Sequence, residues 1–455
     1  IVLLAGEHTP FRHDTDREMP FRQESNFYYL SGCTVPASFL LLVYQASTSL
    51  SKTPVIDLFI PKAELADMMW SVPPPSLEVA KQTHEVTKVD HPTALPEAIQ
   101  DLVKAFPEAL FHTLPRNSPL FPELPEEYTS AVLSPSNPSG AVTDAYLLSA
   151  LHRARLTKDE DEIRYIKHAN EISSRAHEVV MRVLGKAKEA EAEAIFVASC
   201  RREGAVHQAY LPIVAASTRA STLHYCCNDR EFSWGPLNPQ VLLIDAGCEW
   251  NCYASDITRT MPVGNGGKFT PEAKAIYELV LEMQKLSMDI LRAGLHWDAV
   301  QLLCHRTLVK GFQRLGIFKT PNSTNSGSWN AEEAILASGV SAAFFPHGVG
   351  HSLGMDVHDV PSASKPAAFY AYLRLRLPLE EGMVVTVEPG IYFSPHLLAP
   401  VRDSKHIDHE VLKKYENVGG VRIEDVVLIT KNGHENLTTV RSDVEWLEKV
   451  CSGEI

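Results

Sequence analysis

The sequence predicts two domains, an α/β domain over residues 1–155 and a larger α+β domain over residues 156–455. A chain of 455 residues is too long for one ordinary core, since single domains usually hold roughly 100–200 residues. Short apolar runs alternate with helical patches and Pro-rich breaks in the first 150 residues, which is typical of a small α/β domain. A long amphipathic pattern begins near residue 157, and helices and strands are mixed beyond it.

Short runs of β-prone residues define the first domain. Phe39–Val43 and Val55–Ile60 are such runs, and Pro96–Phe106 has the pattern of a short helix. The chain begins at Ile1 rather than at a Met, inside what reads as a strand. We therefore expect that N-terminal residues are missing, together with any targeting signal that they carry.

A predicted helix opens the second domain. Thr157, as N-cap, and Glu160 have the spacing of a capping box, and apolar residues follow at helical spacing. A second helix is expected over residues 189–202, and Thr270-Pro271 begins a third. Strands are predicted at Val241–Ile244, Phe344–Pro346, Val384–Val387 and Val421–Ile429.

Composition argues against two classes of partner. The net charge is −14, whereas a nucleic-acid-binding chain needs a basic surface to meet phosphates. No apolar run approaches the roughly 18 residues that a transmembrane helix needs, so no membrane partner is expected. The eight cysteines follow neither a disulfide framework nor a zinc-finger spacing. We expect a cytoplasmic protein with reduced thiols.

Two aspartates flank a predicted hairpin turn. Asp245 ends the apolar run Val241–Ile244, and Asp256 follows the turn at Gly247–Asn251. A carboxylate at the end of a buried strand is costly unless it is paired or binds a metal. Taken alone, each aspartate also fits a helix cap or a turn residue.

Histidines are concentrated in residues 346–359. This short segment holds His347, His351 and His358, whereas the whole chain has 19 histidines. The glycines between them disfavour a helix and let the backbone pass close to a site. The alternative interpretation is a set of scattered surface histidines.

Two glutamates lie at or near predicted strands. Glu388 follows Val384–Val387 and precedes Pro389-Gly390, which is a turn signal. Arg422 and Glu424 are two residues apart, so in a strand their side chains face the same way. Taken alone, Glu388 fits a solvated strand end, and the other two residues fit a surface ion pair.

Together these residues predict a metal centre. Asp245, Asp256, Glu388 and Glu424 with one histidine form a hard, oxygen-rich ligand set, which suits Mn²⁺ better than a structural zinc. Four carboxylates are more than one divalent ion needs, and they suit two ions about 3.5–4 Å apart. Such a pair activates a water molecule and stabilises the oxyanion that forms when the water attacks a carbonyl. The ligand chemistry by itself predicts a dinuclear hydrolase.

The local contexts of these residues resemble the metallopeptidases with the pita-bread fold, and within them the prolidase and Xaa-Pro aminopeptidase branch. The order Asp…Asp…His…Glu…Glu matches, in the contexts LIDAG, SDITRT, PHGVGH, DVHD, TVEPGIYF and GGVRIED. The resemblance covers residues 157–445, and PFRQESNFYYLSGC (Pro20–Cys33) extends it to a creatinase-like N-terminal domain. It implies a creatinase-like α/β domain, a pita-bread α+β catalytic domain, and hydrolysis of Xaa-Pro bonds that releases the N-terminal residue before proline.

The resemblance also implies roles for individual residues. The metal ligands it implies, for two Mn²⁺ ions per subunit or another divalent metal in vitro, are Asp245, Asp256, His351, Glu388 and Glu424. The implied catalytic residues are His347, His358, Glu388 and Arg422. The implied substrate-binding residues are Tyr210, Ile213, His224, His347, His358 and Arg374, the last as the arginine that holds a substrate carboxylate. Small peptides with proline in the second position are the implied substrates, and a homodimer is the implied assembly.

Three other functions are compatible with this fold. The N-terminal domain and the GVRIED context disfavour a methionine aminopeptidase, and the complete ligand set disfavours a creatinase-like hydrolase, which works without metals. The third is a catalytically inactive protein-interaction module, but such modules have typically lost metal ligands. Dipeptidase and aminopeptidase specificity both stay open, because a dipeptidase binds the free carboxylate directly after proline and an aminopeptidase leaves that end open.

Overall fold

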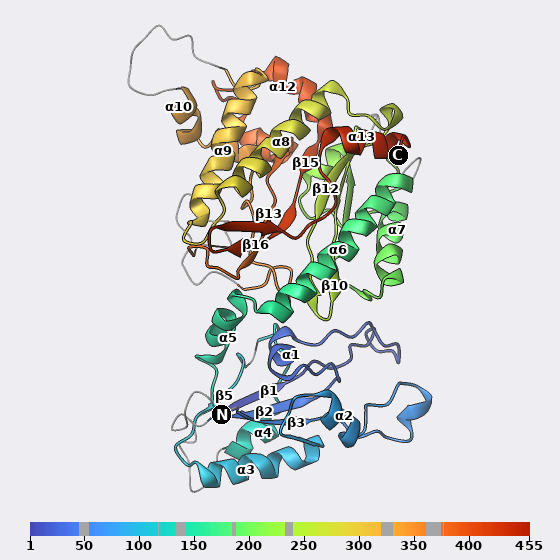
Figure 1. Cartoon of the computed structure of the whole chain (residues 1–455), viewed down its shortest axis with the longest axis vertical. Coiled ribbons are helices and arrows are strands. Elements are labelled where there is room, and N and C mark those ends of the chain that lie inside the picture. The colour runs from blue at the N-terminus through green and yellow to red at the C-terminus, as the bar shows by residue number, and fades with distance from the viewer. Residues whose placement is uncertain are drawn as a thin grey trace. The chain divides into compact units, whose positions relative to one another are not determined.

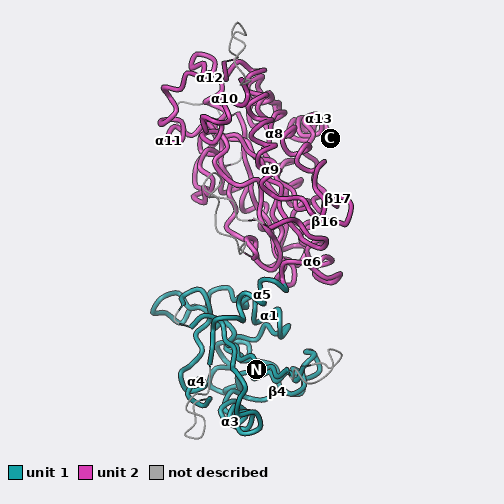
Figure 2. The backbone as a smooth tube through the Cα atoms, turned by 90° about the vertical axis from the view of Figure 1, so that its left-hand side faces the viewer, with its two compact units in different colours: residues 1–154 teal, residues 155–455 magenta. Residues whose placement is uncertain are grey.

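The computed structural model describes residues 1–44, 54–116, 118–132, 142–183, 188–232, 240–319, 331–360, 375 and 377–455. Backbone proximity divides the chain into two compact units, residues 1–154 and residues 155–455 (Figure 2). Within the described ranges, no helix is both long enough and apolar enough to cross a bilayer.

The first unit is built on a mixed β-sheet. Its helices and strands (Figure 1) are, in chain order, β1 (Val2–Ala5), α1 (Ser25–Ser31), β2 (Phe39–Val43), β3 (Val55–Phe59), α2 (Leu77–Thr83), β4 (Lys88–Asp90), α3 (Leu95–Ala105), β5 (Phe111–His112), α4 (Glu126–Val132), β6 (Val142–Thr143) and α5 (Leu147–Leu156), whose last two residues belong to the second unit. The described strands are hydrogen-bonded in the order β4-β3-β2-β1-β5-β6. Strand β1 is antiparallel to β2 and parallel to β5.

Apolar side chains cover both faces of this sheet. Leu3 and Leu41 pair across β1 and β2 and face a core that α3 and α4 complete. Leu4 and Leu40, the next pair along, point the opposite way into a second core with α1, α2 and α5. All four side chains are almost fully buried. Continuous apolar runs are therefore the pattern that a strand buried on both faces requires.

The second unit combines long helices with several short sheets. Its described elements are α6 (Glu160–Val183), α7 (Glu189–Arg202), β7 (His207–Gln208), β8 (Ile213–Ala216), β9 (Val241–Asp245), β10 (Cys248–Trp250), β11 (Tyr253–Ala254), β12 (Thr258–Pro262), α8 (Pro271–Ile290), α9 (Trp297–Arg314), α10 (Ala331–Ala337), β13 (Val384–Val387), β14 (Gly390–Tyr392), α11 (Pro395–Leu398), α12 (His409–Tyr415), β15 (Gly420–Arg422), β16 (Asp425–Thr430), β17 (Gly433–Asn436) and α13 (Val444–Ser452). Helix α6 packs on α7, and α8 packs on α9, with strands between the two pairs (Figure 1).

The short sheets of the second unit meet at one place. Strand β9 pairs antiparallel with β8 and β12, whereas β13 pairs with β16, and β14 with β15. A single bridge between Thr258 and Glu424 joins the first of these sheets to the turn between β15 and β16. One continuous apolar core lies beneath, with side chains from α6 to α9 and from all of these sheets. The bridge therefore brings together segments that are far apart in the sequence.

The capping box of α6 is shifted by two residues from the predicted one. Asp159 is the N-cap, since its carboxylate accepts from the backbone N–H groups of Asp161 and Glu162. The Glu162 carboxylate in turn accepts from the Asp159 N–H. Two box spacings overlap in this segment, and the bridge from Thr157 to Met383 withdraws Thr157 from the cap.

Other predicted elements divide into correct and wrong ones. Helices α7 and α8 and strands β9 and β13 follow the prediction, with the Thr270 hydroxyl capping α8 through the N–H of Ala273. The strand predicted at Phe344–Pro346 is wrong, because this segment follows a 3₁₀ turn and Phe344 packs edge-on against Phe312. The strand predicted at Val421–Ile429 is two strands, β15 and β16, with different partners.

Candidate active site

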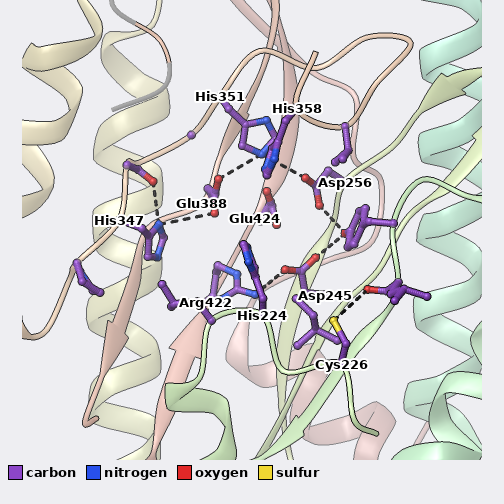
Figure 3. A pocket seen from close by; sticks show the side chains of 18 residues that line it. His224, Cys226, Asp245, Asp256, His347, His351, His358, Glu388, Arg422 and Glu424 are labelled. Carbon is purple, nitrogen blue, oxygen red and sulfur yellow. Dashed lines mark hydrogen bonds and ion pairs between the residues drawn. The ribbon is translucent and has the colours of Figure 1, made fainter. Parts of the chain in front are cut away.

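A cavity of about 610 Å³ in the second unit collects the predicted site residues (Figure 3). The predicted residues that line it are Tyr210, Ile213, His224, Asp245, Asp256, His347, His351, His358, Glu388, Arg422 and Glu424. The remaining one, Arg374, lies outside the described residues. Leu211, Leu223, Cys226 and Val357 complete the less polar part of the wall.

A hairpin that starts at the end of β9 places the two aspartates. Asp245 is the last residue of β9 and is opposite Thr258 of β12 in the antiparallel register. Between them the chain makes a tight turn at Asn251 and Cys252, whose φ angles of 48° and 64° are both positive. Gly247 lets the arms of the hairpin approach, since a Cβ there would lie 2.0 Å from the Ser255 carbonyl oxygen. This close approach holds Asp245 and Asp256 on one wall of the cavity.

The glycine-rich segment places His351 beside Glu388. Gly350 runs against β13 so closely that a Cβ would lie 1.9 Å from the Thr386 carbonyl oxygen. The His351 N–H donates to Thr386 Oγ1 at 3.0 Å, and Glu388 follows directly after β13. As a result, His351 Nε2 lies 3.4 Å from Glu388 Oε1 and 3.3 Å from Asp256 Oδ2.

The tautomer of His351 is set by a backbone carbonyl. His351 Nδ1 lies 3.1 Å from the Ser352 carbonyl oxygen, which can only accept, so Nδ1 carries the proton. The lone pair of Nε2 then faces oxygens of two carboxylates, Asp256 and Glu388. Acceptors this close together repel one another unless a proton or a metal ion lies between them, and a neutral imidazole nitrogen is a common metal ligand.

Glu424 is oriented by a chain of hydrogen bonds. Thr258 Oγ1 donates to Glu424 Oε2 at 2.6 Å, and Arg422 Nε donates to Thr258 Oγ1 at 3.1 Å. The same arginine forms an ion pair with Asp245, with 2.5 Å between Nη2 and Oδ2. Arg422 therefore contacts one predicted metal ligand directly and acts on another through Thr258.

Tyr210 lies closer to the carboxylates than a pocket-lining residue needs to. Its hydroxyl contacts Asp256 Oδ1 at 2.5 Å and also Asp245 Oδ1. A phenol has one proton, so it donates to one of the two carboxylates at a time while its oxygen lies against both. Burial, followed by the charges of the two aspartates, raises the pKa of Tyr210 well above its ordinary value, so the hydroxyl stays protonated.

His347 belongs to a separate hydrogen-bonded series. Its Nδ1 lies 2.8 Å from the Gly348 carbonyl oxygen and therefore donates, which leaves Nε2 to accept from the Tyr392 hydroxyl at 2.8 Å. Arg422 Nη1 donates to the same hydroxyl at 2.9 Å. Burial, reinforced by the Arg422 charge, lowers the pKa of His347 to about 3, so this imidazole is neutral.

The carboxylates of the site are electrostatically crowded. Burial is the largest cause that raises the pKa of Asp256, Glu388 and Glu424 well above the ordinary range. Charges on neighbouring carboxylates raise these pKa values further, and Arg422 opposes them. A divalent cation would compensate this excess of negative charge.

The donor set fits a metal ion. One ligand atom each from Asp256, His351 and Glu424 come within 4.8 Å of one another. Asp245 and Glu388 line the same cavity and add carboxylate oxygens. Hard oxygen donors with one imidazole suit Mn²⁺-like ions better than a closed structural zinc site.

Sequence reasoning missed three residues that hold the site together. Thr258, Thr386 and Tyr392 each donate to or accept from a predicted site residue. All three lie inside the quoted contexts SDITRT and TVEPGIYF. The sequence shows that these residues lie close to the predicted ligands along the chain. It does not show which group each hydroxyl contacts, and that contact is what makes the three residues important.

The fold and the site define a metal-dependent hydrolase with a carboxylate-rich centre. The model of metallopeptidase family M24 matches residues 164–431, and that of the aminopeptidase P N-terminal domain matches residues 1–111. The chain therefore belongs to metallopeptidase family M24. The predicted fold class is confirmed, an α/β N-terminal domain of the aminopeptidase P type followed by a pita-bread catalytic domain.

Relatives of similar length carry one name. A probable Xaa-Pro aminopeptidase of Pyricularia oryzae is 41% identical over 460 residues, covering 99% of this chain and 92% of the relative. One from Paracoccidioides lutzii is 39% identical over 464 residues, with the same coverage of both proteins.

Solved structures of two bacterial proteins have the same fold. Aminopeptidase P from Escherichia coli superposes with a TM-score of 0.82 at 28% identity, covering 99% of this chain and 94% of that one. Proline aminopeptidase P II from Yersinia pestis gives a TM-score of 0.80 at 31% identity, covering 99% and 95%.

Proposed function

We propose that this protein is an Xaa-Pro aminopeptidase, which hydrolyses the peptide bond before proline and releases the N-terminal residue. The observation that carries the proposal is the gathering of the five candidate metal ligands and four further polar residues, His224, His347, His358 and Arg422, in one cavity. Relatives that span nearly the whole chain bear the name Xaa-Pro aminopeptidase. The substrates we propose are small peptides with proline in the second position.

The proposed metal ligands are Asp245, Asp256, His351, Glu388 and Glu424, for two Mn²⁺ ions. When bound, such ions supply Lewis acidity and an activated water. The side chains do the remaining work. Arg422 and Thr258 keep Glu424 in place, and the His351 tautomer presents a lone pair to the site. Glu388, which is held by Thr386 at 3.4 Å, is the base that we propose for the attacking water.

Recognition of proline follows from the chemistry of its bond. An Xaa-Pro bond has no amide N–H, so a peptidase for it cannot use that donor and needs an apolar surface for the rigid ring. Leu211, Ile213 and Leu223 supply apolar wall in this cavity, and His224 and His358 also line it. We propose that these two imidazoles position the substrate and that Arg422 and neutral His347, joined through Tyr392, support the tetrahedral intermediate.

Two assays test the function. Purified protein is expected to bind close to two equivalents of a divalent transition metal, preferentially Mn²⁺, and to cleave Xaa-Pro-Yaa peptides when loaded. Elemental analysis and product detection measure the two properties separately. Protein that binds metal but cleaves no Xaa-Pro peptide would point to the alternative, a catalytically inactive interaction module. Protein that binds no metal at all would remove the site assignment as well.

Preference between dipeptides and longer peptides depends on one assigned residue. We propose Arg374 as the group that holds a substrate carboxylate directly after proline. Arg374→Ala is then expected to raise KM for Xaa-Pro at least tenfold and to change KM for Xaa-Pro-Yaa less than threefold, since a charged hydrogen bond is worth about 1.5–3 kcal/mol. Arg376→Ala is the matched control. Equal effects of Arg374→Ala on both substrates exclude the carboxylate role.

We also propose a homodimer located in the cytoplasm. Support for the dimer is an apolar patch on the first unit, defined as Leu65, Met69, Trp70 and Val72, whose exposed fractions run from 80% to 95%. Support for the compartment is the sparse spacing of cysteines, which follows no disulfide framework. Fractionation of cells that produce the protein tests the location.

A further inference from the structure

Four charged residues form a network beside the catalytic cavity but outside its lining. Arg155 Nη2 lies 2.6 Å from Asp359 Oδ1 and 2.8 Å from Asp356 Oδ2. Lys158 Nζ lies 3.0 Å from Asp359 Oδ2. The same ammonium donates to the carbonyl oxygens of Arg155 at 2.8 Å and Leu156 at 3.3 Å, which uses its three protons. We name this group the Asp359 network.

The Asp359 network is buried and electrically balanced. The side chains of Arg155, Lys158 and Asp359 are only 1–3% exposed, whereas that of Asp356 is 42% exposed. Two positive and two negative charges cancel. Burying such a group costs desolvation energy, and well-packed apolar residues often stabilise a fold equally well. Stability alone is therefore a weak reason for an ionic network here, whereas directional hydrogen bonds can fix a position.

This network holds in place the segment that carries His351 and His358. The Asp359 N–H donates to the Ser352 carbonyl oxygen at 3.0 Å, which folds residues 352–359 back on themselves. Gly354 lies so close that a Cβ would be 2.5 Å from Asp359 Oδ2. On the cavity side of the same segment, the rings of His351 and His358 are 4.3 Å apart and nearly perpendicular. Figure 3 shows these two side chains next to each other. Asp359 is thus anchored on one side while its neighbour His358 lines the cavity on the other.

The network joins this segment to a second part of the same unit. Lys158 lies in the stretch before α6, where its N–H donates to the Gly382 carbonyl oxygen at 2.8 Å. Gly382 precedes β13, and the Leu353 N–H donates to the Val384 carbonyl oxygen in that strand at 3.0 Å. The histidine segment is therefore held against β13 by backbone bonds and against residues 155–158 by the ionic network.

We propose that Asp359, together with Lys158, is a positioning residue that sets the placement of the His358 imidazole in the cavity. It touches neither metal ligand atoms nor the cavity and acts through His358. The expected effect on catalysis rests on the proposed peptidase function. The contacts that hold Asp359 and its segment in place do not depend on that function.

A double-mutant cycle with His358 tests the proposal. Asp359→Asn is expected to lower kcat/KM for Xaa-Pro-Leu by about 10- to 100-fold in the otherwise unchanged protein, because a displacement of about 1 Å at a site group can cost about 100-fold in rate. In the His358→Ala background the same change is expected to cost less than threefold, because the imidazole it positions is gone. The Kd of Pro-Leu, the product of that cleavage, is also measured by calorimetry for all four proteins of the cycle. A variant that does not turn over substrate then still gives a value. Equal losses in both backgrounds overturn the proposal.

A second comparison separates positioning from folding. Lys158→Met/Asp359→Leu removes one charge of each sign and keeps apolar bulk, and Arg155 keeps its ion pair with Asp356 at 2.8 Å, so its Tm is expected to lie within a few degrees of wild type. Its kcat/KM is expected to stay at least tenfold low, with Pro-Leu binding weakened. Leu447→Ala in α13, a buried residue of the core, is the control that lowers Tm without weakening Pro-Leu binding. If Lys158→Met/Asp359→Leu has the kcat/KM and the Pro-Leu affinity of wild type, the network contributes only to stability, and the proposal is overturned. Wild-type protein that binds Pro-Leu but does not cleave Xaa-Pro-Leu refutes the proposed function only.

Discussion

Four carboxylates within one cavity are the dominant feature at the scale of single residues. Asp256 illustrates their cost, because its surroundings favour the protonated form through burial first and through the charges of Asp245 and Glu388 next. Tyr210 and Arg422 relieve part of this repulsion by donating to the aspartates. Without a metal ion, the electrostatic energy of these close carboxylates is repulsive. With a divalent cation bound between them, the same arrangement is favourable, because each carboxylate can coordinate the ion.

Asp256→Asn is expected to have opposite effects on stability with and without metal. In metal-free protein the change removes a carboxyl group whose charged form is disfavoured by its surroundings, so Tm is expected to rise by a few degrees, the equivalent of about 1 kcal/mol in a unit of this size. In metal-loaded protein a ligand is lost, so Tm is expected to fall. Thermal unfolding in chelator and in excess Mn²⁺ measures both.

The matched control for this change is Asp443→Asn. Asp443 caps α13 through the N–H of Trp446, away from the predicted ligands. Its effect on Tm is expected to be the same in chelator and in Mn²⁺. If Asp256→Asn shifts Tm in the same direction under both conditions, Asp256 is not a metal ligand.

At the scale of elements, two long helices carry buried histidines that the catalytic chemistry does not use. His177 in α6 is fully buried and lies 3.0 Å, through Nε2, from the Ala246 carbonyl oxygen. His305 in α9 hydrogen-bonds Gln301 and Ser341. Burial lowers the pKa of both histidines to about 4. Their neutral forms are therefore part of the packing between helices and strands.

The stability that neutral His177 and His305 contribute is expected to fall as pH decreases from about 6.5 to about 4. In this window the unfolded chain binds protons at His177 and His305 that the folded chain excludes, and each site can cost up to about 3 kcal/mol. His177→Gln keeps a donor for the Ala246 carbonyl and removes one titrating group. Its unfolding free energy minus that of wild type, from urea titrations in chelator between pH 4 and pH 7.5, is expected to become more positive as the pH falls. The site carboxylates, whose pKa values are raised, are the same in both proteins and cancel in this difference.

The control for His177→Gln is His168→Gln on the same helix. The His168 side chain is 41% exposed, so this variant replaces a histidine of the same helix without changing the buried core. A slope that is the same for His177→Gln and wild type would show that His177 protonates equally in the folded and unfolded chain.

At the scale of the whole molecule, the apolar patch on the first unit stands out. Trp70 is 80% exposed and Val72 is 95% exposed, although large apolar side chains are normally buried in a soluble protein. Several large apolar side chains exposed within one short segment are typical of a contact between proteins. It is the feature that supports the proposed homodimer.

Replacing the patch is expected to weaken the dimer. Met69→Ser/Trp70→Ser removes two of its largest side chains, so light scattering after gel filtration is expected to give monomer mass where wild type gives dimer mass. Leu120→Ser is the control, since this leucine of the same unit is 79% exposed but does not belong to the patch. A dimer that survives the double change does not use the patch, and a monomeric wild type refutes the homodimer.

The sequence predicted most of the elements that support the site and was wrong where tertiary contacts decide. Strands β9 and β13 were visible as apolar runs ending at carboxylates. The helix start at Asp159 was not, because two capping spacings overlap and only the pairing of Thr157 with Met383 selects between them. Aromatic residues at Phe344–Pro346 suggested a strand, but their burial comes from packing on α9.

The sequence by itself determined the candidate ligand set and the class of chemistry. Residue type sets what a side chain can bind, so four carboxylates and a histidine in these contexts already defined a metallopeptidase of family M24. Only the tertiary structure decided how those ligands are held. Arg422 reaches Asp245 across 177 positions of the chain, and Thr258 reaches Glu424 across 166. Such bonds depend on which strands pair, and local sequence carries no record of that pairing. The Asp359 network beside the cavity is a product of the fold in the same way, because Arg155 and Asp359 are 204 positions apart.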